Sequence, residues 1–124
     1  VVDASFPEIG KLTDILSFEV KGGYVSEITG KRSIEVKERL NSVGEKAYKV
    51  AELGIGLNPK AIITGNILED EKVIGTVHIA VGNNLSYGGT NDVPLHLDGV
   101  INDATVIVDG KKLLCEGKFL IEGW

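Results

Sequence analysis

Apolar and polar residues alternate with a period of two near the start of the chain. In "DILSFEVKGGYVSEITG", apolar side chains occupy every second position at Leu16, Phe18 and Val20. Gly22 and Gly23 follow directly, and two glycines supply the positive φ angles that a tight turn requires. The pattern therefore predicts a β-hairpin.

The next segment, "SIEVKERLNSVG", changes its apolar period to three or four residues. Val36, Leu40 and Val43 fall on one face of a helix. Ser33 can cap the start of that helix and Gly44 can end it. We predict an amphipathic helix that covers a sheet, with a partner-binding helix as the alternative.

From Glu45 onward the pattern is typical of β-strands. Three segments rich in Val, Ile and Leu follow one another, at 46–56, 72–82 and 94–101. Asp109–Gly110 separates two further apolar runs and predicts a second hairpin. The charged stretch "ILEDEK" (67–72) is expected to be a connection between strands. We expect one α+β domain over residues 1–124, mostly β-strand with antiparallel hairpins and at least one covering helix.

Composition narrows the class of protein. A net charge of −5 over 124 residues argues against a nucleic-acid partner, which needs a clustered basic face. No apolar run approaches the roughly 20 residues of a membrane span. Cys115 is the single cysteine, so no internal disulfide can form and we expect the protein in a reducing, cytoplasmic compartment. We expect Cys115 itself to be a small core residue. The chain contains no methionine, and we expect it to be a piece of a longer protein.

Four polar residues stand in otherwise apolar β segments and are candidates for chemistry. His96 and Asp98 are two positions apart, so on a strand their side chains leave the same face. His78 and Glu52 occupy similar apolar runs. An unpaired buried carboxylate is costly, so Glu52 should be paired, protonated or bound to a metal. The four residues offer two nitrogen and two oxygen ligands, a set suited to a catalytic zinc-type site. The alternative is that both histidines are structural and that His96 only hydrogen-bonds Asp98.

Other chemistries have less support in the sequence. Ser86 lacks the G-x-S-x-G elbow of a serine hydrolase. The glycines of "VGNNLSYGGTND" do not follow a phosphate-loop pattern, and they predict a turn-rich loop that shapes a substrate pocket.

The segments "AELGIGLNP", "VIGTVHIAVGNNLSYGG" and "LHLDGVI", in this order, resemble the C-terminal part of thermophilic metallo-aminopeptidases of the aminopeptidase T group. The final "VDGKKLLCEGKF" is similar to the end of those chains. The early hairpin and helix are similar to the segment before their catalytic glutamate, so the resemblance covers nearly the whole chain.

This resemblance implies a cytosolic, dimeric exopeptidase that uses two divalent metal ions (Zn, Co or Mn) to release N-terminal residues from peptides. Its implied metal ligands are Glu52, His78, His96 and Asp98. Tyr87 is the nearest candidate for a tyrosine that the family places in its site, although it stands nine positions after His78.

One family feature is missing, because no threonine-glutamate-glutamate motif occurs between Val1 and Thr13. The chain is therefore expected to carry most but not all of the metal ligands, to bind one ion or none, and to be inactive alone. The alternative is a non-catalytic assembly or binding module, with the metal absent or structural.

Overall fold

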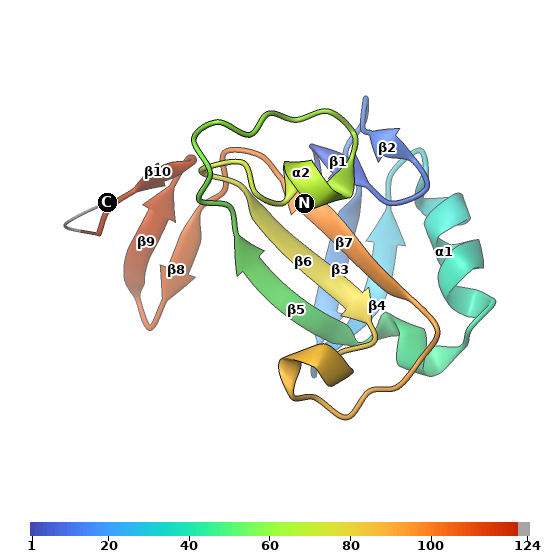
Figure 1. Ribbon diagram of the computed structural model, residues 1–124. Helices are drawn as coiled ribbons and strands as arrows, with labels where there is room; N and C mark the ends of the chain where they lie inside the picture. The colour runs from blue at the N-terminus through green and yellow to red at the C-terminus, as the bar shows by residue number, and fades with distance from the viewer. Residues whose placement is uncertain (122–124) are drawn as a thin grey trace.

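A five-stranded antiparallel sheet lies at the centre of the chain (Figure 1), and the computed structural model describes residues 1–121. Its strands, in spatial order, are β2 (Gly10–Lys11), β1 (Ser5–Phe6), β7 (His96–Ile101), β6 (Val77–Gly82) and β5 (Val50–Ile55). Two smaller sheets accompany it: β3 (Ser17–Lys21) with β4 (Tyr24–Thr29), and β8 (Val106–Val108) with β9 (Lys111–Cys115) and β10 (Lys118–Phe119). The helices are α1 (Ser33–Asn41) and α2 (Ile67–Asp70), with short 3₁₀ turns η1 (Glu45–Tyr48) and η2 (Leu85–Tyr87). The protein is mostly β, with antiparallel sheets and two short helices, as the sequence predicts.

Both predicted hairpins are confirmed. The β3–β4 turn passes through Gly22 (φ 58°) and Gly23 (φ 80°), and the β8–β9 turn through Asp109 (φ 49°) and Gly110 (φ 77°). Paired positive φ angles match the right-handed twist of the flanking strands.

The helices differ in detail from the sequence prediction. Helix α1 buries Val36 and Leu40 as expected, but Arg32 is its N-cap and no side chain caps it. Ser33 is instead the first residue of the helix and is buried, and its backbone N–H donates to the carbonyl of Gly30. The segment 67–72 lies in the connection between β5 and β6, as predicted, but residues 67–70 of it form a one-turn helix that the sequence did not predict. Asn66 accepts a hydrogen bond from the Leu68 N–H and starts the one-turn helix α2 there.

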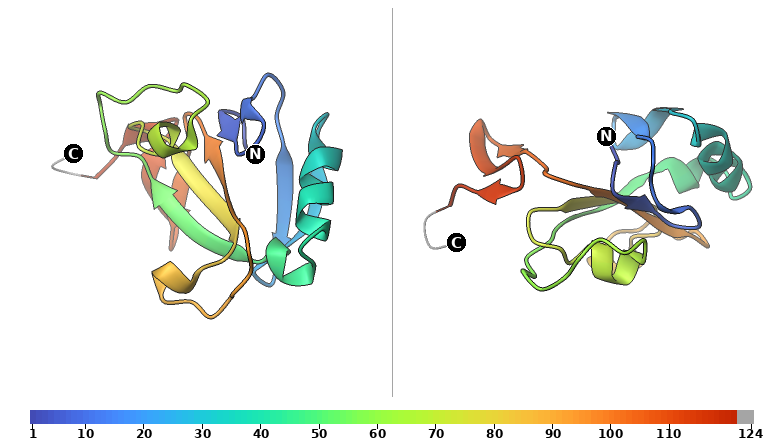
Figure 2. Two further views of the ribbon diagram at one scale, coloured as in Figure 1. Left: turned by 45° about the vertical axis from the view of Figure 1, so that its right-hand side comes forward. Right: turned by 90° about the horizontal axis from the view of Figure 1, so that it is seen from above.

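The two faces of the central sheet have different partners. The right-hand view of Figure 2 shows α1 and the β3–β4 hairpin on one side and α2 with its flanking loop on the other. Val81 and Leu97 belong to the main apolar core together with Val36 and Leu40 of α1. Because strand residues alternate between faces, His78 and Asp98 lie on the opposite side.

A β-bulge in β5 sets the direction of Glu52. Val50 pairs with Val81 whereas Glu52 pairs with Ala80, so the register shifts between the two. In a regular strand Val50 and Glu52 would share a face. The bulge places Val50 with the apolar core and Glu52 on the face of His78, the kind of re-aiming for which bulges are used beside functional sites.

Within residues 1–121, no helix has the length and apolar character needed to cross a membrane.

Candidate metal centre

Four side chains meet on one face of the central sheet. His78 Nε2 lies 3.2 Å from Glu52 Oε1, and His96 Nε2 lies 3.0 Å from Glu52 Oε2. His96 Nε2 is also 3.3 Å from Asp98 Oδ2. The structure thus brings together all four candidate metal ligands of the sequence, and their role as ligands stays a prediction. The Glu52 side chain is only 15% exposed and contacts both imidazoles.

The middle strand β6 carries a small residue between these side chains. Ala80 of β6 pairs with Glu52 on one side and with Asp98 on the other. Ala80 is fully buried and carries only a methyl group. The longer side chains of the flanking strands can therefore reach each other above it.

The loop that joins β6 to β7 holds the ring of His96. His96 Nδ1 lies 2.7 Å from the backbone oxygen of Asn83. A carbonyl oxygen only accepts hydrogen bonds, so Nδ1 carries a proton. Nε2 can then either carry a second proton and donate to the carboxylates or, in the neutral ring, offer its lone pair to a metal ion. This is the arrangement in which a protein orients a histidine ligand.

Asn83 belongs to a network of asparagines that fixes this loop. Asn91 is buried, and its amide donates to the carbonyls of Lys46 (2.8 Å) and Gly82 (2.7 Å). The backbone N–H of Asn91 donates to Asn84 Oδ1 at 2.8 Å. Sequence reasoning predicted only a turn-rich loop here. The adjacent Asn83 and Asn84 could have indicated this network, since asparagine side chains form hydrogen bonds with the backbone in turns.

Burial and hydrogen bonding shift the pKa values of the cluster residues in different directions. Burial acts to raise the pKa of Glu52, but hydrogen bonds from Tyr87 and His78 outweigh it, and the pKa is lowered. Burial likewise acts to lower the pKa of His96, whereas the Asn83 carbonyl and the charge of Asp98 raise it above its ordinary value. Burial raises the pKa of Asp98. The shifts of Glu52 and His96 favour a carboxylate beside an imidazolium, whereas burial disfavours the charged form of Asp98.

The cluster fits a metal ion. Glu52, His78 and Asp98 each offer one ligand atom, and these atoms lie within 4.8 Å of one another. Among the described residues, Asp98 Oδ1 and His78 Nδ1 are buried without a hydrogen-bond partner. A buried carboxylate oxygen without a partner is costly, and a bound cation removes that cost. The residues present could therefore hold a metal ion.

Tyr87 lies at the edge of the cluster. Its ring stacks on His96, with centroids 5.8 Å apart and planes inclined by 22°. Hydrogen bonding to Glu52 raises the pKa of Tyr87. Its predicted catalytic role is not tested by this placement and stays a prediction.

A groove of about 460 Å³ begins at His78 and runs along the loop after β5. Its lining residues are Ile55, Leu57, Asn58, Glu71, Lys72 and His78. The groove joins an apolar wall to several polar groups beside the cluster, a composition typical of small-molecule sites.

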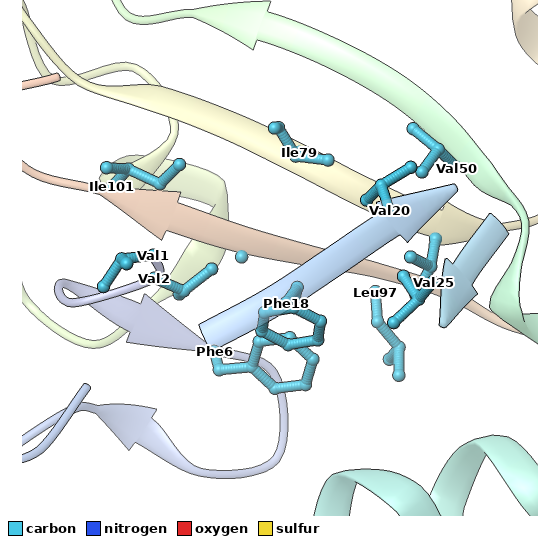
Figure 3. A pocket seen from close by; sticks show the side chains of 12 residues that line it. Val1, Val2, Phe6, Phe18, Val20, Val25, Val50, Ile79, Leu97 and Ile101 are labelled. Atoms are coloured by element: carbon cyan, nitrogen blue, oxygen red, sulfur yellow. The ribbon is translucent and has the colours of Figure 1, made fainter. Parts of the chain in front are cut away.

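A second cavity, of about 80 Å³, lies between the β3–β4 hairpin and the other face of the sheet (Figure 3). All 12 residues that line it are apolar, among them Phe18, Ile79 and Leu97. Ile79 alternates with His78 and Ala80 along β6, so the cavity and the metal cluster are on opposite faces. It offers no ligand atom from a side chain.

Comparison with known proteins gives two matches. A family model described as NicX: 2,5-dihydroxypyridine 5,6-dioxygenase matches residues 2–121. The solved structure of 2,5-dihydroxypyridine dioxygenase from Pseudomonas putida KT2440 is similar in fold, with a TM-score of 0.86 at 18% identity. The match covers 99% of this chain and 39% of that chain, so this chain spans well under half the length of its structural relative. A search of curated proteins found no match.

These matches overturn the predicted identity. The resemblance to aminopeptidase T, and with it the peptidase activity, the hydrolase class and the metalloprotease function, was wrong, because the dioxygenase family model accounts for residues 2–121. The physical reason lies in the ligand set. Two imidazoles and two carboxylates bind several divalent metals, and such a set does not by itself select hydrolysis over oxidation.

Proposed function

Because this chain belongs to the NicX family of 2,5-dihydroxypyridine 5,6-dioxygenases, we propose that it carries the metal centre of an enzyme that opens a hydroxylated pyridine ring with molecular oxygen. The observation that carries the proposal is the buried cluster of Glu52, His78 and Asp98, whose ligand atoms lie within 4.8 Å of one another. His96, in contact with both carboxylates, completes the donor set.

The chemistry of the family favours a redox-active ion. Zinc has no redox chemistry, whereas two histidines with one carboxylate are the common ligand set of non-haem iron(II) oxygenases. We therefore propose one iron(II) ion here, in place of the pair of Zn, Co or Mn ions that the aminopeptidase resemblance implied. His78 and His96 would be the two imidazoles of that set, and Asp98 and Glu52 its candidate carboxylates. The bound ion would supply activation of oxygen and of the hydroxylated ring.

The remaining residues bind and orient the substrate. A flat ring would lie in the groove beside His78, against the apolar side chains of Ile55 and Leu57. Asn58 and Lys72, on the polar side of that groove, would bind the ring hydroxyl groups. Tyr87 would shield the far side of the cluster, because its ring covers His96.

Iron loading tests the proposal directly. The purified protein is mixed anaerobically with iron(II), and bound iron is measured after desalting. We expect about one ion per chain, and Asp98→Asn should abolish that binding because it removes a ligand charge. Asp14→Asn is the matched control, since it removes a carboxylate that is 40% exposed and pairs with Lys31. Iron binding that is equal in Asp98→Asn and in the unchanged chain would refute the site.

Activity is measured in a second step. The assay follows the loss of 2,5-dihydroxypyridine absorbance and the uptake of oxygen. It uses the iron-loaded chain. We expect one oxygen molecule consumed per ring opened, because a dioxygenase places both oxygen atoms in the product. Ring loss without oxygen uptake would contradict the proposed reaction.

Two further expectations remain proposals. The net charge of −5 supports the absence of a nucleic-acid partner, and the single cysteine supports a cytoplasmic location. The homodimer that the aminopeptidase resemblance implied stays an untested prediction. The peptide substrate is not proposed again, because the peptidase that required it has been replaced.

A further inference from the structure

We infer that Gly54 is a positioning residue for the metal centre, whose missing side chain provides the seat for the imidazole of His78. Gly54 of β5 is the direct cross-strand partner of His78 of β6. The role of Gly54 in metal binding rests on the proposed function. The evidence that Gly54 positions His78 is the packing of the two residues.

The His78 ring lies against the backbone of Gly54, in the space that a side chain of residue 54 would occupy. A Cβ atom placed on Gly54 would lie closer than 3.0 Å to three atoms of the His78 ring, namely Nε2, Cε1 and Cδ2. Real Cβ atoms do not tolerate such distances, so any other residue excludes the ring from its present position. Glycine within a strand commonly marks a place where another group approaches closely.

The position of the ring matters because its Nε2 atom faces the ligand atoms of the cluster. His78 Nε2 reaches Glu52 Oε1 at 3.2 Å, and the imidazole is 8% exposed. Displacement from the Gly54 seat would break this contact and move Nε2 away from Asp98, its neighbour in the triad. The backbone of Gly54 does not have a positive φ angle. Glycine is therefore required here for space rather than for backbone conformation.

A neighbouring glycine provides the contrast. Gly56, two positions later, also lacks a positive φ angle, but a Cβ atom there would meet the backbone carbonyl of Val73. A backbone atom cannot move aside without distorting the fold, whereas an imidazole can rotate about its side-chain torsions. Alanine at Gly54 should thus displace His78 and leave the fold intact, and alanine at Gly56 should destabilise the fold and leave His78 in place.

The experiment compares Gly54→Ala with Gly56→Ala in two measurements. In metal-free protein, nuclear Overhauser contacts between the His78 ring protons and residue 54 report the seat directly. Only two histidines exist in the chain, so His78→Ala assigns the signals. In the second measurement, iron(II) or cobalt(II) affinity is determined by titration, with thermal unfolding in the presence of chelator as the check on folding.

We expect Gly54→Ala to unfold near the temperature of the unchanged protein, to lose the ring contacts, and to bind metal about 10- to 100-fold more weakly, the range typical of lost ligand orientation. Gly56→Ala should unfold earlier yet keep both the contacts and the affinity of its folded form. Gly54→Ala should have no further effect on affinity when His78→Ala is already present, since both changes remove the same ligand.

Unchanged ring contacts and affinity in Gly54→Ala would overturn the inference. An additive loss in the double variant would also overturn it, because Gly54 would then act through another group. If the unchanged protein bound no metal, the proposed function would fail, whereas the ring contacts in metal-free protein would still decide the role of Gly54.

Discussion

Glu52 and His96 stand on strands that are not neighbours, yet His96 Nε2 lies 3.0 Å from Glu52 Oε2. Strand β6 runs between them, and Ala80 is the residue that separates Glu52 from Asp98 in the same row of the sheet. The residue of β6 opposite His96 is Gly82, so both intervening positions, Ala80 and Gly82, are small and let the two side chains reach each other.

Ala80→Val should therefore separate the two halves of the cluster. The added methyl groups enter a fully buried position, and overpacking of this kind costs about 1–3 kcal/mol in the free energy of unfolding. We expect metal affinity to fall as well, because the branched side chain stands between the carboxylates. Denaturant unfolding and metal titration measure the two effects. Ala104→Val, in the smaller core cluster, is the control and should reduce stability only. Equal metal affinity in both variants would show that Ala80 does not set the spacing.

Tyr87 contributes a ring and a hydroxyl group that substitution can separate. Tyr87→Phe keeps the ring that stacks on His96, so we expect metal affinity to stay close to that of the unchanged protein. Ring-opening turnover should fall, because the hydroxyl bond to Glu52 is lost. Tyr87→Ala should weaken both metal binding and turnover. Tyr24→Phe, on the β3–β4 hairpin, serves as a neutral control. Metal binding that is as weak in Tyr87→Phe as in Tyr87→Ala would assign the effect to the hydroxyl alone.

Asn91 should be the residue on which the loop before β7 depends. Asn91→Ala removes the donors to the carbonyls of Lys46 and Gly82 and leaves both without this partner. Buried polar groups left unpaired cost about 1–3 kcal/mol each, so we expect a loss of about 2 kcal/mol in the free energy of unfolding. A shift in the denaturant midpoint measures this loss. Asn102→Ala should cause little change, because Asn102 binds Asp3 through its backbone N–H. A shift of equal size in both variants would argue against the network.

Asp70 fixes the loop that precedes α2 on the metal-binding side of the sheet. Its fully buried carboxylate accepts from the backbone N–H groups of Thr64 (2.7 Å) and Gly65 (2.9 Å). Asp70→Ala leaves two donors unsatisfied and should cost about 3 kcal/mol in unfolding free energy. Asp70→Asn should recover part of that stability, because an amide oxygen still accepts one bond. Calorimetric unfolding compares the two variants, and an Asp70→Ala protein as stable as Asp70→Asn would contradict this role.

Local patterns were enough to predict the two hairpins, helix α1 and the strands that carry the site. The alternation around Phe18, the glycine pair at the first turn and Asp109–Gly110 at the second each describe interactions between residues close in sequence. Glu52, His78, His96 and Asp98 were also found from sequence alone, because a charged or titratable group within an apolar strand requires a partner. The short helix at Ile67–Asp70 was missed, since a single turn capped by Asn66 has too few residues to show a period.

Only the tertiary structure decided how these residues work together. The bulge between Val50 and Glu52 turns Glu52 toward His78, and this depends on pairing with β6 rather than on the sequence of β5 itself. The space above Ala80 and the seat at Gly54 likewise depend on which residues face each other across strands. The reaction could not be predicted from the ligand set, because a group of imidazoles and carboxylates indicates that a metal can bind but not which reaction the metal supports. Similarity over residues 2–121 to a dioxygenase family, rather than any short motif, showed that the chain does not belong to a peptidase family.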